Sequence, residues 1–230
     1  MSILITAPGN GQHQQKNGYK FTVNDRSSFY DWYNAYFEVK FILQHLADGA
    51  PYPGAADEAN RCNLINGAHS LIKHIMIRSA GKIVYDTDNL HQVVFIKNLM
   101  EYSDDFSQSV AKESFWYLDA NAGTKVGADN AAYNVGYATR RLLTAANADV
   151  NVIIPLNRCS FFEELEDKML VPMEIQFEIE LNDDHEIIHR DHNAAEGRVV
   201  INRFYLWLPK ILSEDSMYNQ FDSSFLKETQ

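Results

Sequence analysis

The stretch HEIIH, from His185 to His189, has residue types and a spacing that match a catalytic motif. On an α-helix, two histidines four residues apart share one face and can bind zinc, while Glu186 would act as a general base. On a β-strand the same two histidines lie ~13 Å apart, which is too far for one metal ion. The motif follows Asn-Asp-Asp at 182–184, a turn signal after a strongly alternating strand, so we expect a return strand at 186–190. A zinc hydrolase therefore remains only a remote alternative.

Two other groups of side chains could support chemistry or binding. A pair of carboxylates across a cleft can hydrolyse glycosides, but acids that follow one another in sequence are more typical of a solvated helix face. The acidic group consists of Glu163, Glu164, Glu166 and Asp167. Aromatic side chains can stack on sugars or bases, although packing in a core or an interface is their more common use. The aromatic group consists of Phe29, Tyr30, Trp32, Tyr33, Tyr36 and Phe37.

Other catalytic signatures are absent from the sequence. It has no G-x-S-x-G nucleophile elbow, no P-loop and no His-x-His pair of the cupin type. We therefore predict no catalytic, cofactor-binding or metal site, and a protein that is not an enzyme.

Charge and cysteine usage exclude further classes of function. The net charge of -11 over 230 residues disfavours direct binding to nucleic acid, whose phosphates it would repel. Cys62 and Cys159 are far apart and form no Cys-x-x-Cys, so we expect buried free thiols. The chain has no long apolar run, no signal-peptide pattern and no Asn-x-Ser/Thr sequon. These features predict no membrane association and a protein that is not secreted.

Hydrophobic alternation dominates the rest of the chain. Apolar residues occupy every second position at 35–43 and again at 173–181, which predicts long strands with one buried face. Shorter strands are expected at 3–6, 19–23, 115–118 and 149–155, a hairpin at 70–86, and a last strand at 199–208 closed by Pro209. Residues 89–103 predict a helix with Asp88 as N-cap that packs Leu90, Val93, Val94 and Met100 on the sandwich.

Together these elements predict an all-β fold. About eight antiparallel strands, with one or two helices in long connections, fit a jelly-roll sandwich better than an α/β fold. We expect an N-terminal arm or edge strands at 1–28, the jelly roll at 29–209 and a C-terminal connector at 210–230. That connector is too apolar for a solvated tail, so we expect it to pack against something that follows.

Several stretches resemble a known family. They include FYDWYNAYFEVKFILQHLADG and RVVINRFYLWLPK, and the most specific are NGAHSLIKHIMIRSAGKIVYD, FWYLD and IPLNRCSFFEELEDKMLVP. They are similar to the major capsid proteins of Polinton/Maverick transposable elements and the related adintoviruses. The resemblance runs from about residue 29 to 209, and none of its stretches is a catalytic signature.

The resemblance implies a structural protein that self-assembles. Members of that family have two jelly rolls, form trimeric, hexon-like capsomers and tile an icosahedral shell, so this chain would hold the first jelly roll only. Homo-oligomers, neighbouring capsid proteins and a location in the virion, after an intracellular stage, are implied as well. Two alternatives stay open at this point: a single jelly-roll minor (penton) capsid protein, and a carbohydrate- or ligand-binding jelly roll.

Overall fold

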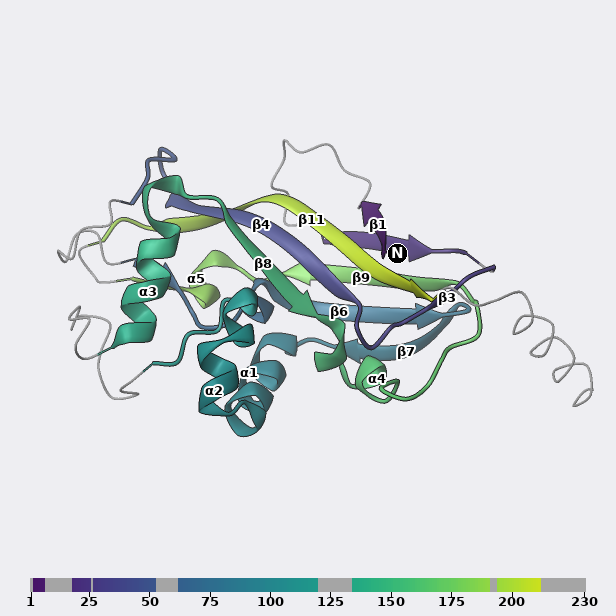
Figure 1. The fold of residues 1–230 in the computed structure, drawn as a ribbon. Coiled ribbons are helices and arrows are strands. Elements are labelled where there is room, and N and C mark those ends of the chain that lie inside the picture. The colour runs from purple at the N-terminus through teal and green to yellow at the C-terminus, as the bar shows by residue number, and fades with distance from the viewer. Residues whose placement is uncertain are drawn as a thin grey trace, which may run out of the picture.

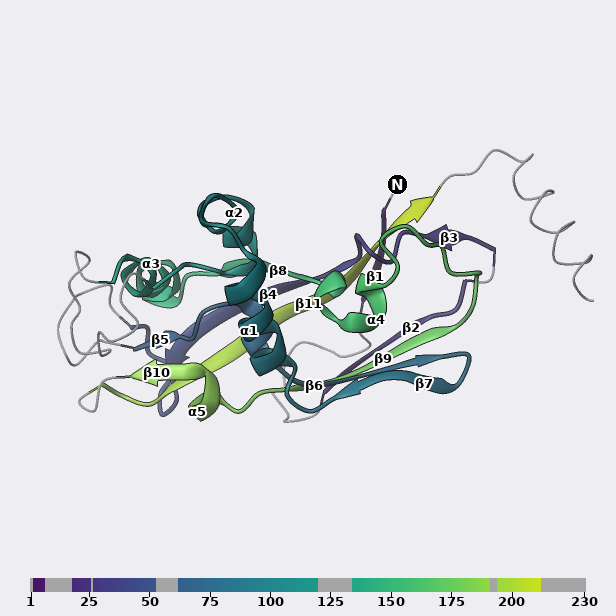
Figure 2. The ribbon, with the colours of Figure 1, turned by 90° about the horizontal axis from the view of Figure 1, so that it is seen from below.

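A computed structural model describes residues 2–6, 18–25, 27–52, 62–119, 134–190 and 194–211, and it shows two facing antiparallel sheets (Figure 1). In spatial order, the first sheet holds β1 (Ser2–Thr6), β11 (Gly197–Ile211), β4 (Tyr36–His45) and β8 (Val150–Pro155). The second holds β2 (Tyr19–Val23), β9 (Ile175–Leu181), β6 (Ile72–Ser79) and β7 (Lys82–Thr87). Figure 2 shows the two sheets as separate layers.

The strand order identifies the type of sandwich. If these eight strands are numbered along the chain, the sheets have the orders 1-8-3-6 and 2-7-4-5, with every pairing antiparallel. Successive strands therefore alternate between the two layers for much of the chain, which is the arrangement of a jelly roll. The predicted fold class is confirmed. Short strands supplement the sheets: β3 (Phe29–Tyr30) pairs with β11, and β5 (Cys62–Leu64) pairs with β10 (Ile188–Arg190).

The connections carry more helical turns than the one or two helices expected. The connection from β7 to β8 contains α1 (Leu90–Glu101), α2 (Asp104–Gln108) and α3 (Val135–Thr144). Two single turns, α4 (Ser160–Glu163) and α5 (Asp184–Ile187), lie on either side of β9 in sequence. Both views place α1 and α2 along one flank of the sandwich and α3 near the end that holds β5 (Figures 1 and 2). Within the described residues, the helices are too short or too polar to span a bilayer.

The alternating strands form the core as predicted. On β4 and the residue before it, Ala35, Phe37, Val39, Phe41 and Leu43 are all 1% exposed or less. These side chains share one face because successive residues of a strand point to opposite sides.

The facing strand β9 buries its own alternate residues. Ile175, Phe177 and Ile179 are at most 2% exposed, as expected. The Phe177 ring lies 5.7 Å from Phe37 of the opposite sheet and 5.8 Å from Phe162 of α4, measured between ring centroids. The two sheets are therefore joined by aromatic contacts at the centre of the sandwich.

The first 28 residues contribute edge strands to both sheets. β1 pairs with β11 and β2 pairs with β9, each at the outside of its sheet. Gly18 is required where β2 begins, because a Cβ there would stand 1.7 Å from the carbonyl oxygen of Ile179. The division of the chain at 28/29 and 209/210 stays a prediction, and residues 212–230 of the expected connector lie outside the described residues.

The expected end of the last strand is wrong, and one expected strand is absent. The last strand does not close at Pro209 but continues to Ile211. Pairing with β4 already ends at Trp207, so the missing N–H of proline leaves no β4 acceptor unpaired, and its carbonyl oxygen accepts from Asp31 N at 2.9 Å. The strand expected at 115–118 is absent: Phe115 ends a 3-10 turn with φ 57°, a left-handed conformation that stops regular structure.

The predicted helix at 89–103 is confirmed as α1, but its buried face differs from the expected one. Leu90 and Val94 are buried, whereas Val93 is 47% and Met100 82% exposed. The buried stripe is Leu90, Val94 and Asn98, spaced by four residues, so Val93 and Met100 fall on other faces. The N-cap is Asn89 rather than Asp88.

Phe177→Ala tests the aromatic contact between the sheets. We expect a loss of ~3–5 kcal/mol in the free energy of unfolding, because the cavity would lie among rings that cannot collapse into it. Phe106→Ala is the matched control, since Phe106 is 36% exposed, and it should cost about 1 kcal/mol or less. Urea denaturation followed by tryptophan fluorescence measures both. Equal losses for the two variants would contradict this description of the core.

Candidate functional site

The two histidines of the HEIIH motif lie on different elements. His185 and Glu186 belong to the single helical turn α5, and His189 belongs to β10. Because the helix ends at Ile187, the histidines do not share a helical face as the zinc motif requires. Among the described residues, no group of three or more His, Cys, Asp or Glu side chains could hold a metal ion.

The hairpin expected around this motif is wrong. The chain leaves β9 and forms a helical turn at 184–187, and β10 then pairs with β5 rather than returning along β9. Asp184 connects this turn to β11, because its carboxylate accepts a hydrogen bond from the backbone N of Val199 at 2.8 Å. Burial raises the pKa of the Asp184 carboxyl group above its usual value, and the hydrogen bond from Val199 opposes this only in part. Contacts with β11 and β5, distant in sequence, therefore decide the local conformation.

A hollow beside the motif contains charges of both signs. It has a volume of about 660 Å³, and its lining includes Asp183, His185, Arg190 and Glu196. Arg190 and Glu196 form an ion pair at 3.1 Å, and Arg190 also donates to the carbonyl oxygen of Ala194 at 3.0 Å. Through these two contacts, Arg190 supports the segment 194–197.

The acidic group at 163–167 forms a solvated face. Its four carboxylates are exposed, while Phe162 and Leu165 between and before them point into the core. Glu163 forms an ion pair with Lys97 of α1, and Glu164 lies 4.0 Å from Lys168. The first of these pairs joins α4 to α1.

The aromatic group at 29–37 belongs largely to the core. Tyr30, Trp32 and Phe37 are at most 5% exposed, and Trp32 stacks on Phe162 with ring centroids 5.5 Å apart. A buried tryptophan presents no face to a sugar or a base, so the group does not support the ligand-binding alternative.

Both cysteines are buried free thiols, as the sequence predicts. Burial raises the pKa of Cys62 to about 11 and that of Cys159 to about 12. The thiolate form, which is the nucleophile, is therefore scarce at neutral pH.

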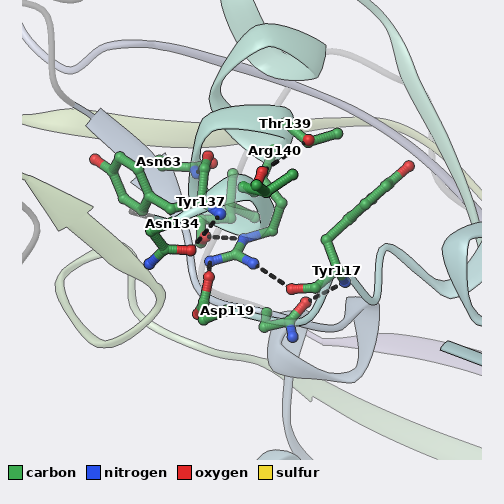
Figure 3. A network of polar contacts seen from close by, with 10 residues as sticks. Asn63, Tyr117, Asp119, Asn134, Tyr137, Thr139 and Arg140 are labelled. Atoms are coloured by element: carbon green, nitrogen blue, oxygen red, sulfur yellow. Dashed lines mark hydrogen bonds and ion pairs between the residues drawn. The ribbon is translucent and has the colours of Figure 1, made fainter. Parts of the chain in front are cut away.

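A buried arginine that we did not single out in the sequence organises the end of the sandwich. Arg140 of α3 is 3% exposed. Its Nη1 donates to the carbonyl oxygen of Tyr117 at 2.8 Å, its Nε to that of Leu64 at 3.3 Å, and its Nη2 lies 3.2 Å from both carboxylate oxygens of Asp119 (Figure 3). One side chain therefore connects α3, β5 and the segment before residue 120. The sequence feature that could have revealed Arg140 is the helix 135–144, which begins after the N-cap Asn134. We did not predict this helix.

The neighbours of Arg140 complete this connection. Asn63 of β5 donates from Nδ2 to the carbonyl oxygen of Tyr137 at 2.9 Å, and Asn66 Oδ1 accepts from Tyr117 N at 2.7 Å. Gly136 allows the close approach, because a Cβ there would stand 2.3 Å from the carbonyl oxygen of Leu118. Backbone groups at this end of the fold thus obtain partners without a regular sheet.

Exposed apolar side chains gather on the helical connection. We call the set on α1, α2 and the turn after them the α1–α2 ridge. It consists of Val93, Phe95, Ile96, Leu99, Met100, Phe106 and Val110, each between 36% and 82% exposed. Surface of this kind commonly marks a site of protein association.

The comparisons with known proteins agree with the fold. No protein-family model matches the chain, and no curated protein matches it. The fold is similar to the crystal structure of the mavirus major capsid protein, with a TM-score of 0.52 at 9% identity, over 94% of this chain and 47% of that chain. It is also similar to a chain of the Sputnik virophage structure, with a TM-score of 0.56 at 10% identity, over 94% of this chain and 48% of that chain.

The class defined by these observations is a jelly roll of the kind found in viral capsid proteins. At such identities the likeness establishes the fold. This chain spans about half the length of the solved chains that it resembles, and thus corresponds to one jelly roll of a virophage major capsid protein.

Variants of the Arg140 network should separate its backbone contacts from its ion pair. Arg140→Ala should cost roughly 3 kcal/mol or more, because two buried carbonyl oxygens lose their donor. Asp119→Asn should cost under about 1 kcal/mol, because the Asp119 side chain is 37% exposed and Arg140 keeps both carbonyl partners. Urea denaturation measures both losses, and hydrogen exchange at the Tyr117 amide reports the local effect. A larger loss for Asp119→Asn would show that the ion pair dominates.

A buried histidine should make the fold sensitive to acid. His69 is 3% exposed, with Nε2 3.5 Å from the carbonyl oxygen of Pro155. Burial, with a smaller effect of Arg158, lowers its pKa to about 4. Between the unfolded-state pKa of ~6.5 and about pH 4, His69 is protonated in the unfolded chain but neutral in the folded protein. The free energy of unfolding therefore decreases as the pH is lowered through this window, by up to ~3 kcal/mol.

The pH dependence of His69→Gln measures that contribution. Urea denaturation between pH 7 and pH 4.5 gives the free energy of unfolding at each pH. Its slope against pH should be smaller for His69→Gln than for the unmodified protein, by the equivalent of up to about one bound proton. His185→Gln is the matched control, because the His185 side chain is 77% exposed, and it should leave the slope nearly unchanged. Parallel curves for the unmodified protein and His69→Gln would contradict the prediction.

Proposed function

We propose that this protein is a structural building block of a viral-type icosahedral shell, of the major, hexon-like type. The observation that carries the proposal is the jelly-roll fold, which is similar over 94% of the chain to the structure of the mavirus major capsid protein. A shell subunit needs a rigid body and extended contact surfaces rather than a catalytic cleft. The aromatic contacts between the sheets and the helices along the flank meet both needs.

The chemistry of the candidate sites supports a structural role. The HEIIH histidines lie on separate elements, the acids at 163–167 lie on a solvated face, and Trp32 is in the core. The proposal accordingly assigns no catalytic residue, cofactor or metal to the chain. The net charge of -11 favours contacts with protein rather than direct contacts with a packaged genome.

The resemblance of the sequence to Polinton/Maverick and adintovirus capsid proteins supplies the finer proposal. In that form the jelly roll described above is the first of two, the segment that follows β11 connects it to the second, and three copies build a capsomer. The virion is the proposed location. The neighbours in such a shell are further copies and other capsid proteins.

Self-assembly of the purified chain tests the proposal. Native mass spectrometry and negative-stain electron microscopy, over a range of protein concentrations, should show association that grows with concentration and assemblies with threefold or sixfold symmetry. A closed pentamer would instead support the minor, penton-type alternative. A monomer at all concentrations that binds glycans on an array would overturn the shell proposal in favour of a ligand-binding jelly roll.

A further inference from the structure

The helix α1 is apolar around most of its circumference. Leu90 and Val94 point into the sandwich, yet Val93, Ile96 and Met100 are between 47% and 82% exposed on other faces. The outer face of a surface helix is usually polar, so exposed apolar residues on several sides of α1 are unusual for a helix that faces only solvent. The outer side of α1 therefore has the composition of a contact surface.

The charges of this helix form ion pairs within the molecule. Lys97 is paired with Glu163 of α4, and the Lys97 side chain is 17% exposed. Glu101 is paired with Arg158, whose guanidinium also lies 4.5 Å from the centroid of the Tyr102 ring. Both charges on α1 are thus compensated within the molecule, so covering the helix need not leave them unpaired.

Aromatic contacts beneath the surface connect the two helices that carry the α1–α2 ridge. Phe95 lies 5.4 Å from Trp116, Trp116 lies 5.7 Å from Tyr102, and Tyr102 lies 4.6 Å from Phe106, measured between ring centroids. Ser103 caps α2 by accepting a hydrogen bond from Phe106 N at 3.2 Å. A chain of rings that includes the buried Trp116 therefore holds α1 and α2 together under the exposed side chains.

The area of the ridge fits a protein interface. Summed over its seven residues, the exposed surface is roughly 700 Å², of the order of the ~800 Å² that each partner contributes to a standard interface. Both views place the helices at the outside of the sandwich, where a second body can approach (Figures 1 and 2).

We propose that the α1–α2 ridge is a contact surface for a second copy of this chain. The inference rests on the proposed function and names the surface through which subunits meet. Copies with a net charge of -11 repel one another over most of their surface, so they meet best where the charges are compensated and the side chains are apolar. Since Asp104 and Asp105 lie next to the ridge, added salt should strengthen the association by screening.

Charge substitutions on the ridge test the proposal. Sedimentation velocity of the full chain, at low and high salt, should show self-association. It should weaken by about 100-fold or more in Ile96→Glu and in Met100→Glu, because each would bury an unpaired charge. Leu142→Glu is the matched control, since Leu142 is 60% exposed on α3, and it should change the affinity by about threefold at most. Circular dichroism verifies that each variant is folded.

An isotope-mixed cross-linking experiment identifies the occupant directly. Cys62 and Cys159 are buried, so Met100→Cys supplies the accessible thiol. A mixture of ¹⁴N- and ¹⁵N-labelled protein is treated with a thiol–amine cross-linker, and Leu142→Cys is the control. Heavy–light pairs that join residue 100 to another copy, and are rare for residue 142, are the expected result.

The outcomes separate this inference from the proposed function. If the protein assembles but the ridge variants associate as well as the unmodified chain, the ridge is not the contact and the shell role stands. Cross-links from residue 100 only to residues 212–230 of the same copy would also overturn the inference, with the chain's own C-terminal segment as the cover. A ridge-dependent dimer that forms no larger assembly would support the inference and contradict the shell role. A monomer at all concentrations would overturn both.

Discussion

The contact between the apolar faces of the two sheets is the constraint on which the rest of the structure depends. Phe37 and Phe177 meet across the sandwich, and their neighbours on β4 and β9 are at most 2% exposed at every second position. A shift of either strand by one residue would turn this whole set outward, so burial determines the register of the sheets. The edge strands and the short strands are added to a frame that these two strands position.

The connections solve a different physical problem, which is to provide partners for backbone groups at the ends of the sandwich. Arg140 is buried at such an end, and it donates to carbonyl oxygens of Leu64 and Tyr117 while its charge is compensated by Asp119. A side chain with several donors can thus replace the ladder of a sheet. This solution joins α3 to β5 and to the segment that ends at Asp119.

Packing and charge pairing account for the positions of the residues that could have supported catalysis or ligand binding. The acids at 163–167 lie on a solvated face and Lys97 pairs with one of them, while Trp32 fills the core beside Phe162. Apolar side chains remain exposed on α1 and α2 after these pairings. In a protein whose proposed work is assembly, the functional surface is expected to be such a region, where the pairing of charges and the burial of apolar groups are incomplete within one subunit.

The sequence by itself determined the elements whose pattern is local. Period-2 alternation predicted β4 and β9 with their buried residues, and the fold class followed from the number and length of such strands. Only the tertiary structure decided the conformation of 184–190, because Asp184 bonds to Val199 and β10 pairs with β5, and both partners are distant in sequence. It also decided which face of α1 is buried, since that helix is apolar on several sides and its own periodicity carries little information. Arg140 was missed for the same reason: its role comes from three segments that meet only in the folded chain.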